Sequence, residues 1–123
     1  MSMSDLINVG VSDRVNDKLD DLKERGIFAD KIDAYRFGVS LALAHGAIGG
    51  DLIERKNLFN VGSLDPDQLI KTAVEALHAD LLAETTVYRL VERLADWGVS
   101  EIHAQAVTGN IDFDTLLSQT SAS

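Results

Sequence analysis

The stretch LINVGVSDRVNDKLDDLKERGIFADKIDAYRFGVSLALAH, residues 6–45, carries the clearest structural signal in the chain. Residues 6–11 have the period-two pattern of a short half-buried strand. One side of this strand holds Ile7, Val9 and Val11, and the other holds Leu6, Asn8 and Gly10. Since a single strand is not stable by itself in water, we expect it to pair with another strand.

Two helices are predicted after this strand. Ser12 is placed to cap a helix that runs to about Arg25, where a glycine follows. The buried stripe of this helix is Val15, Leu19 and Leu22. A second helix is expected over 30–45, and in its central part only Arg36 and Ser40 are clearly polar. A helix that is apolar on all sides must be covered on all sides, so this helix needs extensive cover.

The second half of the chain predicts further helices. The run Asp65-Pro66-Asp67-Gln68 has the residues of a helix start, with an aspartate as N-cap and a proline at the first helical position. The apolar stripe of this helix is Leu69, Ile70, Ala73, Val74, Leu77 and Leu81. Thr86 is placed to cap a further helix that Gly98 ends, and two shorter helices are expected over 100–108 and 112–119.

These elements predict a mainly α fold, in which an N-terminal short strand is followed by a multi-helix bundle and two chains form an intertwined dimer. The alternative is a monomeric bundle, in which the second half of the same chain covers the apolar helix. A strand-helix-helix oligomerisation segment is expected over residues 1–46. An acidic helical segment over 51–119 is expected to pack with it in a single compact domain, and 120–123 to be a frayed tail. Within the acidic segment, residues 58–61 have the pattern of a short strand. The turn between the two segments is rich in glycine: Gly46, Gly49 and Gly50.

Composition narrows the class of protein. The 123 residues include 20 acidic and 11 basic side chains, so the formal net charge is −9. Residues 1–60 contribute −2 of this charge and residues 61–123 contribute −7. The 46% hydrophobic content excludes wholesale disorder, and the absence of cysteine excludes disulfide scaffolds and thiolate catalysis. Neither a signal peptide nor a membrane span is recognisable, so we expect a cytoplasmic protein with no membrane partner.

The polar residues do not form a recognisable catalytic pattern. Three histidines are scattered and lack the spacing of metal-binding helices: His45, His78 and His103. The pairs Asp65/Asp67 and Asp112/Asp114 stand at predicted helix starts, where capping explains them. The sequence therefore predicts no catalytic residue, no cofactor and no metal site. The enzyme alternative has as its candidate residues His78, His103, Asp112 and Asp114.

The order of strand, helix, glycine turn and apolar helix over residues 6–45 resembles the ribbon-helix-helix family. The resemblance is carried by residues 7–11, Val15, Leu19, Leu22, Gly26 and the helix from Asp30. It implies that two chains pair their N-terminal strands into one antiparallel ribbon and interlock their helices. Small residues on the second helix also leave room for another helix to approach. The residues assigned to oligomerisation are Ile7, Val9, Val11, Gly38 and Ala42.

The same resemblance implies that duplex DNA is bound by the outward strand residues and the start of the second helix. The candidate nucleic-acid residues are Asn8, which could read a base edge, and Lys31, a cation near the helix start. Two aspartates beside Lys31 would repel phosphate, and the net charge opposes nonspecific affinity. A shorter similarity, in residues 22–27 and 35–38, is to the small helical subunit of DNA phosphorothioation systems. No function is carried over from it.

Two functional hypotheses from different classes follow. The leading one is a non-enzymatic helical protein that forms a homodimer or higher oligomer and acts as a protein-interaction module. Its acidic second half would then either face a basic protein partner or simply keep the protein soluble. The alternative is a ribbon-helix-helix regulator that binds DNA and whose acidic half binds a protein partner, as in an antitoxin.

Overall fold

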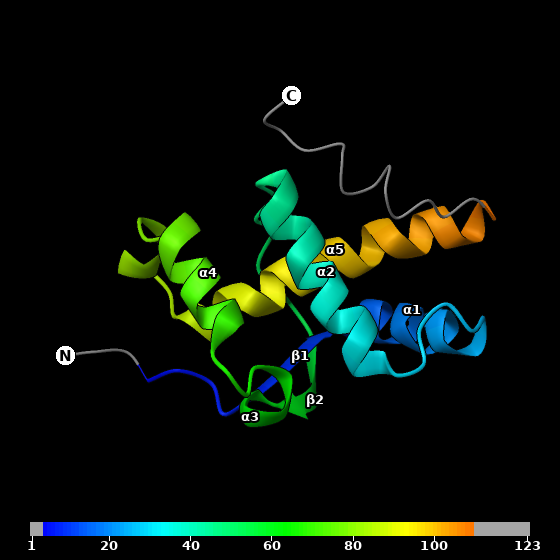
Figure 1. Ribbon diagram of the computed structural model, residues 1–123, viewed down its shortest axis with the longest axis horizontal. Helices are drawn as coiled ribbons and strands as arrows, with labels where there is room; N and C mark the ends of the chain where they lie inside the picture. The colour runs from blue at the N-terminus through cyan, green and yellow to red at the C-terminus, as the bar shows by residue number, and fades with distance from the viewer. Residues whose placement is uncertain (1–3, 110–123) are drawn as a thin grey trace.

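The computed structural model describes residues 4–109 of the chain (Figure 1). In chain order the elements are β1 (Asn8–Ser12), α1 (Asp13–Glu24), α2 (Lys31–His45), β2 (Arg55–Asn60), α3 (Val61–Leu64), α4 (Leu69–Leu77), the 3-10 turn η1 (Leu81–Ala83) and α5 (Val87–Val107). The prediction of a mainly helical fold with a short N-terminal strand is confirmed. No helix within 4–109 is long and apolar enough to cross a membrane. The helix predicted over 112–119, the pair Asp112/Asp114 and the tail 120–123 lie outside the described residues.

β1 and β2 form a two-stranded antiparallel sheet. The register pairs Asn8 with Asn60 at one end and Ser12 with Arg55 at the other. The short strand predicted near residues 58–61 is therefore present, although β2 begins earlier. β1 also starts later than predicted, and Ile7 lies before it with its side chain 76% exposed. Ile7 therefore does not share the buried environment of Val9 and Val11 within one chain.

α1 and α2 lie where their local signals placed them. The hydroxyl of Ser12 accepts a hydrogen bond of 3.4 Å from the backbone N–H of Val15, which caps α1. α2 ends at His45 because Gly46 adopts a left-handed conformation with a φ of 68°. The predicted stripe of α1 is buried in the core: Val15, Leu19 and Leu22.

α5 is the central helix, and it packs against α1, α2, α4 and β1. Its ribbon crosses that of α2 near the centre of Figure 1. It is one continuous helix of 21 residues, so the prediction that a helix ends at Gly98 is wrong. Gly98 instead marks the crossing, because a Cβ at this position would lie 1.9 Å from the carbonyl oxygen of Gly38 on α2. Two glycines thus allow the backbones of α2 and α5 to touch.

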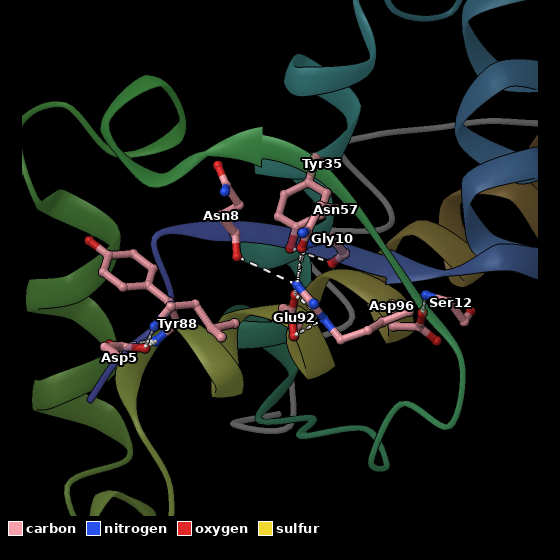
Figure 2. Close-up of polar contacts among 11 residues, drawn as sticks. Asp5, Asn8, Gly10, Ser12, Tyr35, Asn57, Tyr88, Glu92 and Asp96 are labelled. Atoms are coloured by element: carbon pink, nitrogen blue, oxygen red, sulfur yellow. Dashed lines mark hydrogen bonds and ion pairs between the residues drawn. The ribbon is translucent and has the colours of Figure 1, made fainter. Parts of the chain in front are cut away.

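Acidic side chains cap both longer helices of the second half, the predicted Asp65 at α4 and the distant Asp5 at α5. α4 begins at Leu69, later than predicted, and the carboxylate of Asp65 accepts hydrogen bonds of 2.9 and 3.0 Å from two N–H groups of its first turn. Thr86 occupies the N-cap position of α5, but its hydroxyl makes no capping hydrogen bond. The carboxylate of Asp5 accepts instead from the N–H of Tyr88, at 3.1 and 3.2 Å (Figure 2).

α4 is the least covered of the helices longer than one turn. Val74 is its one fully buried side chain within the described structure. Leu69 and Leu77 belong to the apolar stripe identified in the sequence, but they are 71% and 59% exposed. α4 therefore has an apolar side that the rest of residues 4–109 does not cover.

Candidate functional site

Polar groups of α5 and α2 close the free edge of β1 (Figure 2). The backbone N–H of Gly10 donates to Glu92 Oε2 at 2.7 Å, and that of Ser12 donates to Asp96 Oδ2 at 2.9 Å. The carbonyl oxygen of Gly10 accepts from Tyr35 Oη at 2.8 Å. Because β2 pairs with the other edge, both edges of β1 have hydrogen-bond partners within one chain.

Glu92 is a buried carboxylate, 4% exposed, and Arg55 of β2 is its ion-pair partner. Arg55 Nε lies 3.1 and 3.0 Å from the two carboxylate oxygens, and Nη2 also contacts Glu92 and Asn57 Oδ1. Burial raises the pKa of Tyr35 well above its usual value of 10.0, and the charge of Glu92 adds to this effect. A buried carboxylate with this many partners joins α5 to both strands, and its oxygens are engaged in those contacts.

The residues predicted for oligomerisation do not share one surface. Val9, Val11 and Ala42 are fully buried in the core, whereas Ile7 is exposed. Gly38 is buried against α5. The helix that approaches the small residues of α2 is therefore α5 of the same chain, and the strand that pairs with β1 is β2. Pairing between copies through these residues stays a prediction.

The two candidate nucleic-acid residues lie beside different elements. Asn8 is exposed and stands opposite Asn60 in the β1–β2 register. Lys31 Nζ donates to Asn16 Oδ1 at 2.7 Å and forms an ion pair with Asp20 at 2.9 Å, so it is bound to α1. The charge of Lys31 is paired in this arrangement. DNA binding through these residues stays a prediction.

The histidines also lie apart. His103 Nε2 of α5 is 2.8 Å from Asp21 Oδ2 of α1. The pKa of Asp21 lies below its usual 3.8, mainly because of a hydrogen bond from Arg25 and, to a smaller extent, because of the one from His103. His78 Nε2 is buried and makes no hydrogen bond with the described residues. The ring of His45 packs against the indole ring of Trp97 on α5. Among residues 4–109, no group of three His, Asp or Glu side chains could hold a metal ion.

Three arginines line one pocket of about 260 Å³, which we call the arginine pocket. Its lining residues are Asp51, Leu52, Arg55, Thr85, Arg89, Glu92 and Arg93. Sequence reasoning missed this site because the fold brings residues 51–55 together with residues 85–93. One signal was present in the sequence: Arg89 and Arg93 are two of the three basic residues in the acidic second half.

A second uncovered region is apolar. Four residues at helical spacing lie along one side of α4 and are called the α4 surface: Leu69, Ala73, Ala76 and Leu77. A pocket of about 260 Å³, the α2–α4 pocket, adjoins this surface. It is lined by Arg36, Ser40, Leu64, Asp65, Pro66, Asp67, Leu69 and Ile70. Sequence reasoning missed this surface because it placed Leu69 and Leu77 in one apolar stripe with the buried Val74.

Comparison of the chain with protein-family models, with curated proteins and with solved structures gave no match. The arginine pocket and the α4 surface are two candidate sites that the described residues provide.

Proposed function

We propose that the protein is a non-enzymatic interaction module that binds a basic amphipathic helix of a partner protein on the α4 surface. The exposed apolar side of α4 carries this proposal. Leu69 and Leu77 each expose more than half of their surface, and two alanines lie between them on the same side. Contiguous exposed apolar residues on a helix are typical of surfaces that bind a second helix.

The α2–α4 pocket supports the proposal because it provides a place for an anchoring side chain. Its apolar wall consists of Leu64, Pro66, Leu69 and Ile70. Since Leu69 belongs to both the pocket and the α4 surface, a single helix lying along α4 could insert one apolar side chain into the pocket. Anchors of this kind contribute most of the binding energy in many interfaces.

The charge around the α4 surface favours a basic partner over a second copy of this chain. Residues 65–84 contain one basic side chain, Lys71, and five acidic ones: Asp65, Asp67, Glu75, Asp80 and Glu84. A second copy would bring the same excess of negative charge to the interface. Lysine or arginine residues flanking an apolar stripe would instead be attracted to it.

The test uses a defined helical peptide of about 18 residues, with leucines along one side and lysines on the other. We expect this peptide to bind, as measured by fluorescence anisotropy. The double substitution Leu69→Ser and Leu77→Ser is expected to weaken binding by about tenfold or more, because both leucines lose apolar contact area. Circular dichroism should remain unchanged, since both side chains are exposed.

The control variant is Ile53→Ser, because Ile53 is 97% exposed and lies outside α4. This substitution should leave the affinity unchanged. A second control peptide has glutamate in place of lysine, and it should not bind. Equal weakening by the α4 variant and by Ile53→Ser, or equal binding of the two peptides, would show unspecific adhesion and contradict the proposal.

A further inference from the structure

We infer that the arginine pocket binds a phosphate monoester. This site is separate from the α4 surface, and the inference does not depend on the proposed function. Three arginines and two acidic residues, Asp51 and Glu92, are among the residues that line the pocket. Its lining is therefore net positive in a chain whose formal net charge is −9.

The positions of Arg89 and Arg93 favour the binding of an anion. The two residues stand four positions apart on α5, and both line the pocket. Like charges at this spacing repel each other and destabilise a helix. A bound anion between the two guanidinium groups would turn this repulsion into two attractive contacts.

Arg89 and Arg93 have N–H donors without acceptors, whereas Arg55 forms an ion pair with Glu92. Arg89 is exposed, and its side chain makes no hydrogen bond or ion pair with any residue in 4–109. Arg93 Nη2 donates to one backbone carbonyl oxygen at 3.1 Å, and its Nε is buried without an acceptor. Since each guanidinium carries five N–H donors, most of those on both side chains are unused.

Asp51 is the nearest competitor for this charge. Its Oδ1 lies 3.8 Å from Arg93 Nη1, and its side chain is 96% exposed. An ion pair this long and this exposed to water is weak. A ligand in the pocket would therefore displace the carboxylate of Asp51 into solvent at little cost.

The donor set suits a phosphate monoester better than a carboxylate. A phosphate monoester presents three oxygens and close to two negative charges at neutral pH, and guanidinium groups bind phosphate in a bidentate geometry. The hydroxyl of Thr85 adds a neutral donor to the lining, and Leu52 provides an apolar wall for the organic part of the ester. The volume of about 260 Å³ is close to the lower end of small-molecule sites.

The test is calorimetric titration of the full chain with phenyl phosphate at low ionic strength. We expect binding, and we expect Arg89→Gln to weaken it about tenfold because one charge-assisted contact is lost. Arg14→Gln is the matched control: it removes the same charge from an exposed arginine of α1 outside the pocket, and the dissociation constant should change by less than about twofold. Asp51→Asn should tighten binding by no more than about threefold, because the competing carboxylate is gone but its ion pair with Arg93 is weak.

Several results would overturn the inference. These are the absence of binding, equal weakening by Arg14→Gln and Arg89→Gln, and binding of benzoate as tightly as phenyl phosphate. Weaker binding by Asp51→Asn would also overturn it, because Asp51 would then be a part of the site rather than a competitor. Arg55 is not a suitable test residue, since its loss would leave Glu92 buried and unpaired. Thermal unfolding of Arg89→Gln without ligand checks that the fold is intact.

Discussion

The contact between Gly38 and Gly98 depends on the absence of two side chains. A Cβ on Gly98 would lie 1.9 Å from the carbonyl oxygen of Gly38, and a Cβ on Gly38 would lie 2.9 Å from the backbone nitrogen of Val99. Both clashes involve backbone atoms, so neither can be relieved by rotating a side chain. A methyl group at either position would push α2 and α5 apart.

Gly98→Ala is therefore expected to lower the free energy of unfolding by about 1–3 kcal/mol, the range of overpacked cores. Alanine has the higher helix propensity, so the loss would come from packing alone. Chemical denaturation measures the effect. Gly50→Ala is the control, because a Cβ on Gly50 has no atom within 4 Å. A Gly98→Ala variant as stable as the wild type would show that the helices do not touch here.

The two tyrosines of the chain, Tyr35 and Tyr88, give a prediction for alkaline pH. Burial raises the pKa of both above 10.0, and a hydrogen bond to Asp65 adds to the effect at Tyr88. In the unfolded chain both ionise near pH 10. Their contribution to stability is thus complete below pH 10 and is lost as the pH rises further, because the unfolded state releases its phenolic protons first.

We expect tyrosinate absorbance to appear together with the loss of helical circular dichroism as the pH is raised above 10. Tyr88→Phe should remove one tyrosine from this joint transition. If half of the tyrosinate absorbance appeared near pH 10 while the circular dichroism stayed unchanged, one of the two tyrosines would ionise in the folded chain at its ordinary pKa. This result would contradict the burial of that ring.

Among the elements, α4 has one fully buried apolar side chain, Val74, and polar contacts at its start. The carboxylate of Asp65 accepts hydrogen bonds from two N–H groups of α4 and a third, at 2.8 Å, from Tyr88 Oη of α5. Asp65 is buried, whereas Asp67 in the same turn is exposed. One carboxylate therefore caps α4 and also joins it to the central helix.

Asp65→Ala is expected to destabilise the protein by about 2 kcal/mol, the sum of a lost helix cap and a buried tyrosine hydroxyl without a partner. Asp67→Ala is the control and should change the free energy of unfolding by less than about 0.5 kcal/mol, as is usual for surface substitutions. Urea denaturation of both variants provides the comparison. Equal stability of the two variants would show that α4 does not need Asp65.

For the whole molecule, the number of chains in solution distinguishes two arrangements of residues 6–46: one complete within a single chain, and one shared between two copies. The structure satisfies both edges of β1 within one chain. The ribbon-helix-helix resemblance implies instead that β1 pairs with a second copy. We expect the intrachain arrangement in solution, and hence a mass of 13.3 kDa by light scattering.

Measuring the mass of the Leu69→Ser and Leu77→Ser variant as well shows whether any dimer forms through the α4 surface or through residues 6–46. A wild-type dimer that becomes monomeric in this variant would assign self-association to the α4 surface and contradict our argument from charge. A dimer present in both proteins would support pairing through residues 6–46. A monomer in both agrees with the closed edge of β1.

Local patterns predicted α1 and α2 well because their signals lie within each helix. Ser12 caps α1 through its own neighbour in sequence, and Gly46 ends α2 by its own backbone conformation. The role of Gly98 could not be read locally, because it depends on Gly38, which is distant in sequence but adjacent in the fold. A glycine that ends a helix and a glycine that allows a crossing look the same in one sequence.

The candidate sites were less predictable than the fold. The α4 surface escaped prediction because periodicity identifies an apolar stripe but does not show what covers it. The arginine pocket combines Arg55 with Arg89 and Arg93, and that combination requires knowledge of the tertiary packing. Charge counting did show that the second half is poor in basic residues, which made the two arginines of α5 unusual.

The closed edge of β1 has a consequence for the order of folding. Gly10 and Ser12 are hydrogen-bonded to side chains that lie 82 and 84 positions later in the chain. During synthesis, β1 leaves the ribosome long before α5 exists, so its edge stays open until α5 has been synthesised. Contacts this distant in sequence form slowly, and an open strand edge is prone to aggregation in the meantime. Thus β1, the first strand, obtains its last hydrogen-bond partners from Glu92 and Asp96 of α5, the last helix among the described residues to be synthesised.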